Sequence, residues 1–98
     1  MKGAARFPDR EEAWLLCLEA DRRGAENASL MASRAGEWAC YAEGVDRLPP
    51  DLREEFEESS LEELEREGFS PIPPGVWKEI WTGRTHALAA RVGQTYGP

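Results

Sequence analysis

The chain has few of the residues on which most catalytic and metal sites depend. Its 98 residues include one histidine, His86, and two cysteines, Cys17 and Cys40. These three lie too far apart in sequence to form a local metal knuckle such as Cys-x-x-Cys, and no Gly-rich phosphate loop of the GxxxxGK[S/T] type is present. A Cys–His nucleophile pair that meets in space is the catalytic alternative left open. We therefore expect a non-enzymatic protein without a catalytic site, metal or cofactor.

Long apolar runs are also missing. No segment approaches the roughly 18–20 continuous apolar residues that span a bilayer. The apolar run 13–18 is too short for a secretory signal, and charged residues directly precede it. We expect a cytoplasmic protein that makes no membrane contact and keeps both thiols reduced.

Negative charge, in contrast, is plentiful and concentrated in one segment. Residues 51–67, DLREEFEESSLEELERE, hold nine carboxylates and two arginines, so nine minus two gives a net charge of −7. The whole chain also carries −7, so its other 81 residues are balanced. We call residues 51–67 the acidic segment.

The residue patterns predict an all-α fold, in which residues 1–98 form a single small domain of four to five short helices with Pro- and Gly-rich connectors. Asp9 followed by two glutamates is typical of a helix start, and Gly24 is typical of a helix end. We expect the first helix to run to about Arg23. Its centre, AWLLCL, is apolar on every side and should be deeply buried, although a short strand is the competing interpretation of this run.

A second helix is predicted from a seam of apolar residues at alternating steps of three and four. A repeat of 3.5 residues is typical of a helical packing stripe, and small alanines in it would allow close approach of a partner helix. Asn27 is its expected N-cap and Gly44 its expected C-terminal residue. The seam predicts either internal helix packing or a homodimer contact. It consists of Ala28, Met31, Ala35, Trp38, Ala42 and Val45.

The acidic segment predicts two short helices with a break between them. We expect one helix over about 51–58 and another over 61–67, because Ser60 and Glu63 form a capping box that restarts the helix. Residues 70–75, SPIPPG, predict an extended connector, and residues 76–93 predict a basic C-terminal helix. Trp77 and Trp81 lie one turn apart there, in the core or at an interface.

Residues 85–97, THALAARVGQTYG, resemble the first helix and turn of helix-turn-helix DNA-binding proteins. In that family a run like ALAARVG, residues 87–93, precedes the recognition helix, which the resemblance places in the major groove. Five residues follow Gly93 in this sequence, so we expect no recognition helix here. The acidic net charge also disfavours nucleic-acid binding.

The acidic segment leads to the main functional hypothesis. As a helix, its 17 residues would span about 25 Å with one net charge per ~3.6 Å, close to the ~3.4 Å of a single nucleic-acid strand. We expect a regulator or inhibitor that binds a basic protein surface, as some phage-encoded inhibitors and antitoxins do. The alternatives are a DNA-binding regulator using Arg84 and Arg91, a homodimeric adaptor, and a merely solubilising acidic surface. The expected partner-binding residues are Glu54, Glu55, Phe56, Glu57, Glu58, Glu62 and Glu63.

Overall fold

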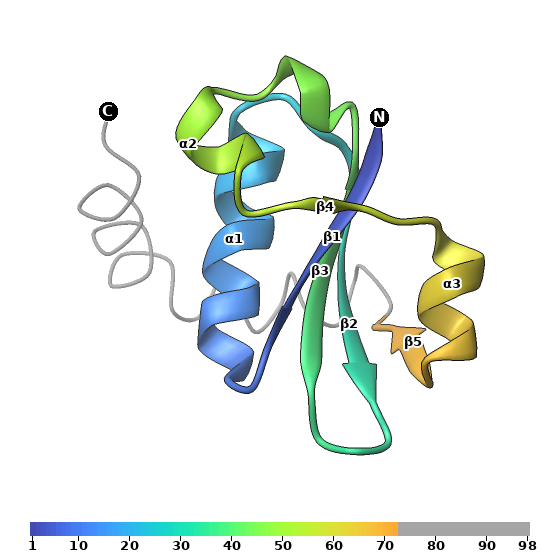
Figure 1. Ribbon diagram of the computed structural model, residues 1–98. Coiled ribbons are helices and arrows are strands. Elements are labelled where there is room, and N and C mark those ends of the chain that lie inside the picture. Colours follow the sequence, from blue (N-terminus) through green and yellow to red (C-terminus); the bar gives the residue numbers. More distant parts are fainter. Residues whose placement is uncertain (73–98) are drawn as a thin grey trace.

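One five-stranded antiparallel sheet organises the protein, with helices against both of its faces (Figure 1). The computed structural model describes residues 1–72. In chain order the elements are β1 (Lys2–Phe7), α1 (Arg10–Arg22), β2 (Glu26–Ser33), β3 (Trp38–Glu43), the 3₁₀ helix η1 (Val45–Arg47), α2 (Pro50–Arg53), β4 (Glu57–Glu58), α3 (Leu61–Arg66) and β5 (Phe69–Pro71). The fold class is therefore α+β.

The strands lie in the order β4-β1-β3-β2-β5. β3 pairs with β1 from Lys2↔Glu43 to Phe7↔Trp38, and β2 pairs with the other side of β3. β1 and β2 consequently run parallel to each other, and α1 makes the crossover between them. The short strands β4 and β5 cover parts of the two edges.

Helix α1 covers one face of the sheet. Trp14, Leu16 and Cys17 pack there in one cluster with Leu30 of β2 and Cys40 of β3, and all five are at most 2% exposed. Because side chains alternate across a strand, neighbouring residues point to the opposite face. Ala4, Met31 and Tyr41 are among the residues that pack there, against Leu64 of α3. Both faces of the central strands are therefore buried.

The predicted all-α fold is wrong, because the predicted second helix is the β2–β3 hairpin. The expected seam divides between strands and a turn: Ala28, Trp38 and Ala42 belong to the α1-side cluster, Met31 belongs to the opposite one, and Ala35 is exposed. An alanine-rich stretch fits the helical repeat of 3.5 residues and the strand repeat of two residues equally well. Gly36, at φ +84°, permits the turn that the helical interpretation placed inside a helix.

Two more predicted features of the helical interpretation differ from the structure. Asn27 is not an N-cap; it has φ +51° beside an irregularity in the β2–β3 register. The helix expected over 51–58 ends at Arg53, and residues 57–58 form β4. The sequence interpretation did not predict β1. Residues 57–58 form a strand and not a helix because they pair with the edge of β1.

The capping signals predicted at Asp9, Gly24 and Ser60 are confirmed, whereas Gly44, expected at the end of a helix, follows β3 and precedes η1. Helix α1 begins after Asp9, whose side chain accepts a hydrogen bond from the Glu11 N–H, and Gly24 follows the helix at φ +100°. Helix α3 begins after Ser60, whose hydroxyl accepts from the Glu63 N–H at 3.2 Å. The rest of the proline connector, the basic helix 76–93, Trp77, Trp81, His86 and the helix-turn-helix-like run lie outside the described residues.

Candidate functional site

The acidic segment starts on the α1 side of the sheet, crosses its outer edge beside β1 as β4, and ends in α3 on the opposite face. It passes from α2 through β4 to α3, and Figure 1 shows β4 crossing beside β1 between these two helices. All nine carboxylate residues of the segment are exposed. This is the expected place for them, because carboxylates lose favourable hydration when they are buried without partners.

Apolar residues between the carboxylates hold the segment against the body of the protein. Leu52 and Phe56 pack in the cluster beneath α1, and Leu64 packs on the opposite face of the sheet. Phe56 is 6% exposed. The prediction that Phe56 is an apolar anchor for a partner therefore needs correction, since in this structure it is a core residue.

Two glutamates of the segment have arginine partners. Glu67 accepts two hydrogen bonds from the Arg6 guanidinium, at 2.8 and 2.6 Å, and these bonds tie α3 to β1. They lower the pKa of Glu67 and raise the pKa of Arg6. Glu62 lies 3.8 Å from Arg66 in an exposed pair, an arrangement that contributes little to stability.

The other glutamates expected at the site are free of ion pairs within residues 1–72. Glu54, Glu55, Glu57 and Glu58 have no cationic group of a described residue within 4.0 Å. Glu63 accepts a long hydrogen bond of 3.5 Å from the Ser59 hydroxyl. These carboxylates therefore leave negative potential at the sheet edge, which lowers the energy of an approaching cation.

The expected rod of charge is not present. The segment forms a four-residue helix, an extended stretch and a six-residue helix, not 17 residues of continuous helix. An extended residue advances about 3.3 Å where a helical residue advances about 1.5 Å, so the uniform spacing resembling a phosphate backbone is lost. The acidic segment instead forms an exposed patch that wraps around the sheet edge at β4.

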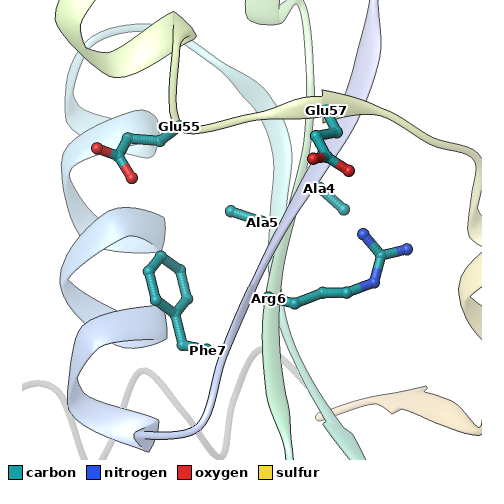
Figure 2. Close-up of a pocket in the computed structure, with 6 residues that line it drawn as sticks. All are labelled: Ala4, Ala5, Arg6, Phe7, Glu55 and Glu57. Carbon is teal, nitrogen blue, oxygen red and sulfur yellow. The ribbon is translucent and has the colours of Figure 1, made fainter.

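Two hollows lie beside β4, within this patch. The first, of about 230 Å³, is lined by residues 4–7 of β1 together with Glu55 and Glu57. Figure 2 shows the two carboxylates above this hollow, with Phe7 on the side of α1 and the Arg6 side chain on the other side. The second hollow, of about 380 Å³, lies at the start of β1 and is lined by Met1, Lys2, Glu58, Ser59, Ser60 and Glu63.

The cysteines lie away from this edge. Cys17 of α1 and Cys40 of β3 are free thiols, and both are completely buried in the α1-side core. Burial raises the pKa of the Cys17 thiol well above its ordinary range, and the neighbouring Cys40 raises it further. A buried thiol with a raised pKa is a poor nucleophile. Across the described part of the chain, no three His, Cys, Asp or Glu side chains gather in a way that could hold a metal ion.

A polar cluster that sequence reasoning missed lies at the bulged end of the β2–β3 hairpin. The Tyr41 hydroxyl donates to Glu43 at 2.6 Å, and the Asn27 amide donates to the other Glu43 oxygen at 2.7 Å. Burial and the neighbouring Glu43 raise the pKa of Tyr41. The Tyr-x-Glu spacing puts both side chains on one face of a strand, so recognition of the strand would have revealed the pair.

The fold and the site define a small α+β protein with an acidic patch around one sheet edge. None of the helices within residues 1–72 has the length and apolar content required to cross a membrane. No protein-family model, curated protein or solved structure matches the chain.

Proposed function

We propose that this protein is a non-enzymatic regulator or inhibitor that binds a basic surface of another protein through the acidic patch. One observation carries the proposal: Glu54, Glu55, Glu57 and Glu58, in and just before β4, are exposed, and no cationic group of a described residue lies within 4.0 Å of their carboxylates. A protein that used these charges to stabilise its own fold would place arginines beside them, as it does for Glu67.

A nucleic-acid-handling protein is the partner class that we favour. Such proteins carry basic grooves for phosphates, and an acidic patch would occupy a groove of this kind and accelerate association. The fold supports an acidic surface without phosphate-like regularity, so the proposed match is one of charge. We also propose a cytoplasmic location, because free buried thiols such as Cys17 and Cys40 are typical of reducing compartments.

Two triple variants of equal net charge test whether the position of the charges matters. The first neutralises the patch: Glu55→Gln, Glu57→Gln and Glu58→Gln. The control neutralises exposed carboxylates elsewhere: Glu12→Gln, Asp21→Asn and Glu37→Gln. Each protein is passed over immobilised poly-L-lysine and eluted with a salt gradient.

We expect the patch variant to bind about tenfold more weakly than the control, because three exposed ion contacts contribute about 0.2–1 kcal/mol each. Elution of both variants at the same salt concentration would show that binding follows overall net charge, and the proposal would fail. Retention of the unaltered protein on double-stranded DNA at low salt would instead favour the DNA-binding alternative, with Arg84 and Arg91 as its contacts.

A further inference from the structure

Within residues 1–72, the outer edge of β1 is only half paired. β1 pairs with β3 along all six of its residues, whereas β4 pairs only with Gly3 and Ala4. No strand of the described chain pairs with the outer side of residues 5–7. The first hollow lies at this open half of the edge.

The backbone groups that face this edge can be assigned from two hydrogen bonds. The Met1 carbonyl accepts from the Val45 N–H, just beyond β3, and the Lys2 carbonyl accepts from the Ser59 N–H, just beyond β4. Successive residues in an antiparallel strand direct their N–H and C=O groups to opposite sides. The groups of Lys2, Ala4 and Arg6 therefore face outward, and those of Arg6 lie beyond the end of β4.

The opposite edge of the sheet is protected in ways that this one is not. β5 has three residues and contains Pro71, which has no N–H to donate to a further strand. The neighbouring β2 has an irregular register beside Asn27, and such bulges hinder edge-to-edge pairing. At the open half of β1 the protection consists of charge, from Glu55 and Glu57.

The charge around the hollow indicates which strands this edge excludes and which it admits. The carboxylates of Glu55 and Glu57 stand over it (Figure 2). Arg6 lines the same hollow, but both oxygens of Glu67 hold its guanidinium. An acidic strand would be repelled, and so would a second copy of this chain, which carries a net charge of −7. A strand with lysine or arginine side chains would be attracted.

We infer that a basic, extended segment of the partner protein adds to the sheet as a strand beside residues 5–7, in line with β4. The outward N–H and C=O of Arg6 pair with its backbone, and Glu55 and Glu57 receive its lysine or arginine side chains. This inference rests on the proposed function and specifies it: the partner supplies an extended basic segment to this half-open edge.

The protein side of the test compares Arg6→Pro with Arg6→Ala. Both variants lose the ion pair with Glu67, but only proline also removes the outward N–H. The ladder to β3 is kept, because Arg6 directs its groups away from β3, and proline is tolerated at such edge positions. Far-UV circular dichroism confirms folding of each variant.

The probe is a synthetic eight-residue peptide of alternating valine and lysine. Its analogue carries N-methyl groups on alternate residues, which remove the backbone donors of one edge and keep every charge. Binding is measured by titration calorimetry, and hydrogen exchange of the Arg6 amide is followed by NMR. We expect Arg6→Pro to bind about three- to tenfold more weakly than Arg6→Ala, the range for one lost hydrogen bond. We also expect the methylated peptide to lose a similar factor and the bound peptide to slow exchange of the Arg6 amide.

The outcomes separate this inference from the proposed function. Equal affinity of the two peptides, with unchanged exchange at Arg6, would overturn strand addition and leave charge-based binding in place. If Arg6→Pro does not fold, the comparison of the two peptides on the unaltered protein still tests strand addition. Equal peptide binding by the patch and control triple variants, or no binding by any protein, would overturn the proposed function itself.

Discussion

Replacing Leu64 by alanine should reveal how α3 is held against the sheet. Leu64 is completely buried and packs with Met31, Tyr41 and Phe69 on the face opposite α1. Leucine-to-alanine changes at such sites lower the free energy of unfolding by about 2–5 kcal/mol, through lost apolar burial and the remaining cavity. Because α3 has only six residues, it has little stability of its own. We expect a loss of about 3 kcal/mol.

Leu61→Ala is a matched control. Leu61 lies in the same helix and undergoes the same chemical change, but it is 39% exposed. Alanine has the highest helix propensity, so we expect the free energy of unfolding to change by less than about 0.5 kcal/mol. Urea denaturation of both variants, followed by tryptophan fluorescence, measures the two values. The patch should also bind poly-L-lysine more weakly in Leu64→Ala, because Glu62 and Glu63 depend on α3 for their position.

Equal losses of stability for Leu64→Ala and Leu61→Ala would contradict this reasoning. They would show that α3 does not use Leu64 to pack against the sheet. A large loss of stability in Leu64→Ala without any change in poly-L-lysine binding would still agree with the packing of Leu64 described above. It would show, however, that Glu62 and Glu63 of α3 do not contribute to binding.

Two further predictions concern buried polar groups. Tyr41→Phe removes the hydrogen bond to Glu43 and should lower the free energy of unfolding by about 1–2 kcal/mol at pH 7. The folded protein raises the pKa of Tyr41 above the unfolded value near 10. The stability that the Tyr41 hydroxyl contributes is therefore complete below pH 10 and declines above it. Urea denaturation at pH 8 and 10.5 should therefore show a smaller difference between the two proteins at the higher pH, and a constant difference would contradict the assigned shift. Glu19→Ala should lower the free energy of unfolding by about 2–4 kcal/mol, because the fully buried Glu19 carboxylate accepts three hydrogen bonds from Arg22 and Arg23 at the end of α1. The exposed Glu12→Ala in the same helix is the control, and it should cost less than about 0.5 kcal/mol by the same measurement.

The exposure of the carboxylates in the acidic segment was predictable from the sequence, but their arrangement was not. The exposure of Glu54 and Glu55 follows from the cost of burying carboxylates, which acts on any fold. The position of Glu57 beside β1 depends on a strand pairing between segments more than 50 residues apart in sequence. Phe56 shows the same limit, because the sequence presents an apolar residue among acids and only packing decides that it faces the core.

The amino-acid sequence by itself determined the features that depend on neighbouring residues. Asp9 and Gly24 bound α1, and Ser60 starts α3, because a cap bonds to backbone groups within a few residues of itself. The tertiary structure alone decided that residues 26–43 are a hairpin. The alanines there fit a helix or a strand locally, and β3 becomes the centre of a sheet because β1 and β2 supply hydrogen-bond partners on both its sides. Those partners lie on other segments, so no pattern within residues 26–43 could reveal them.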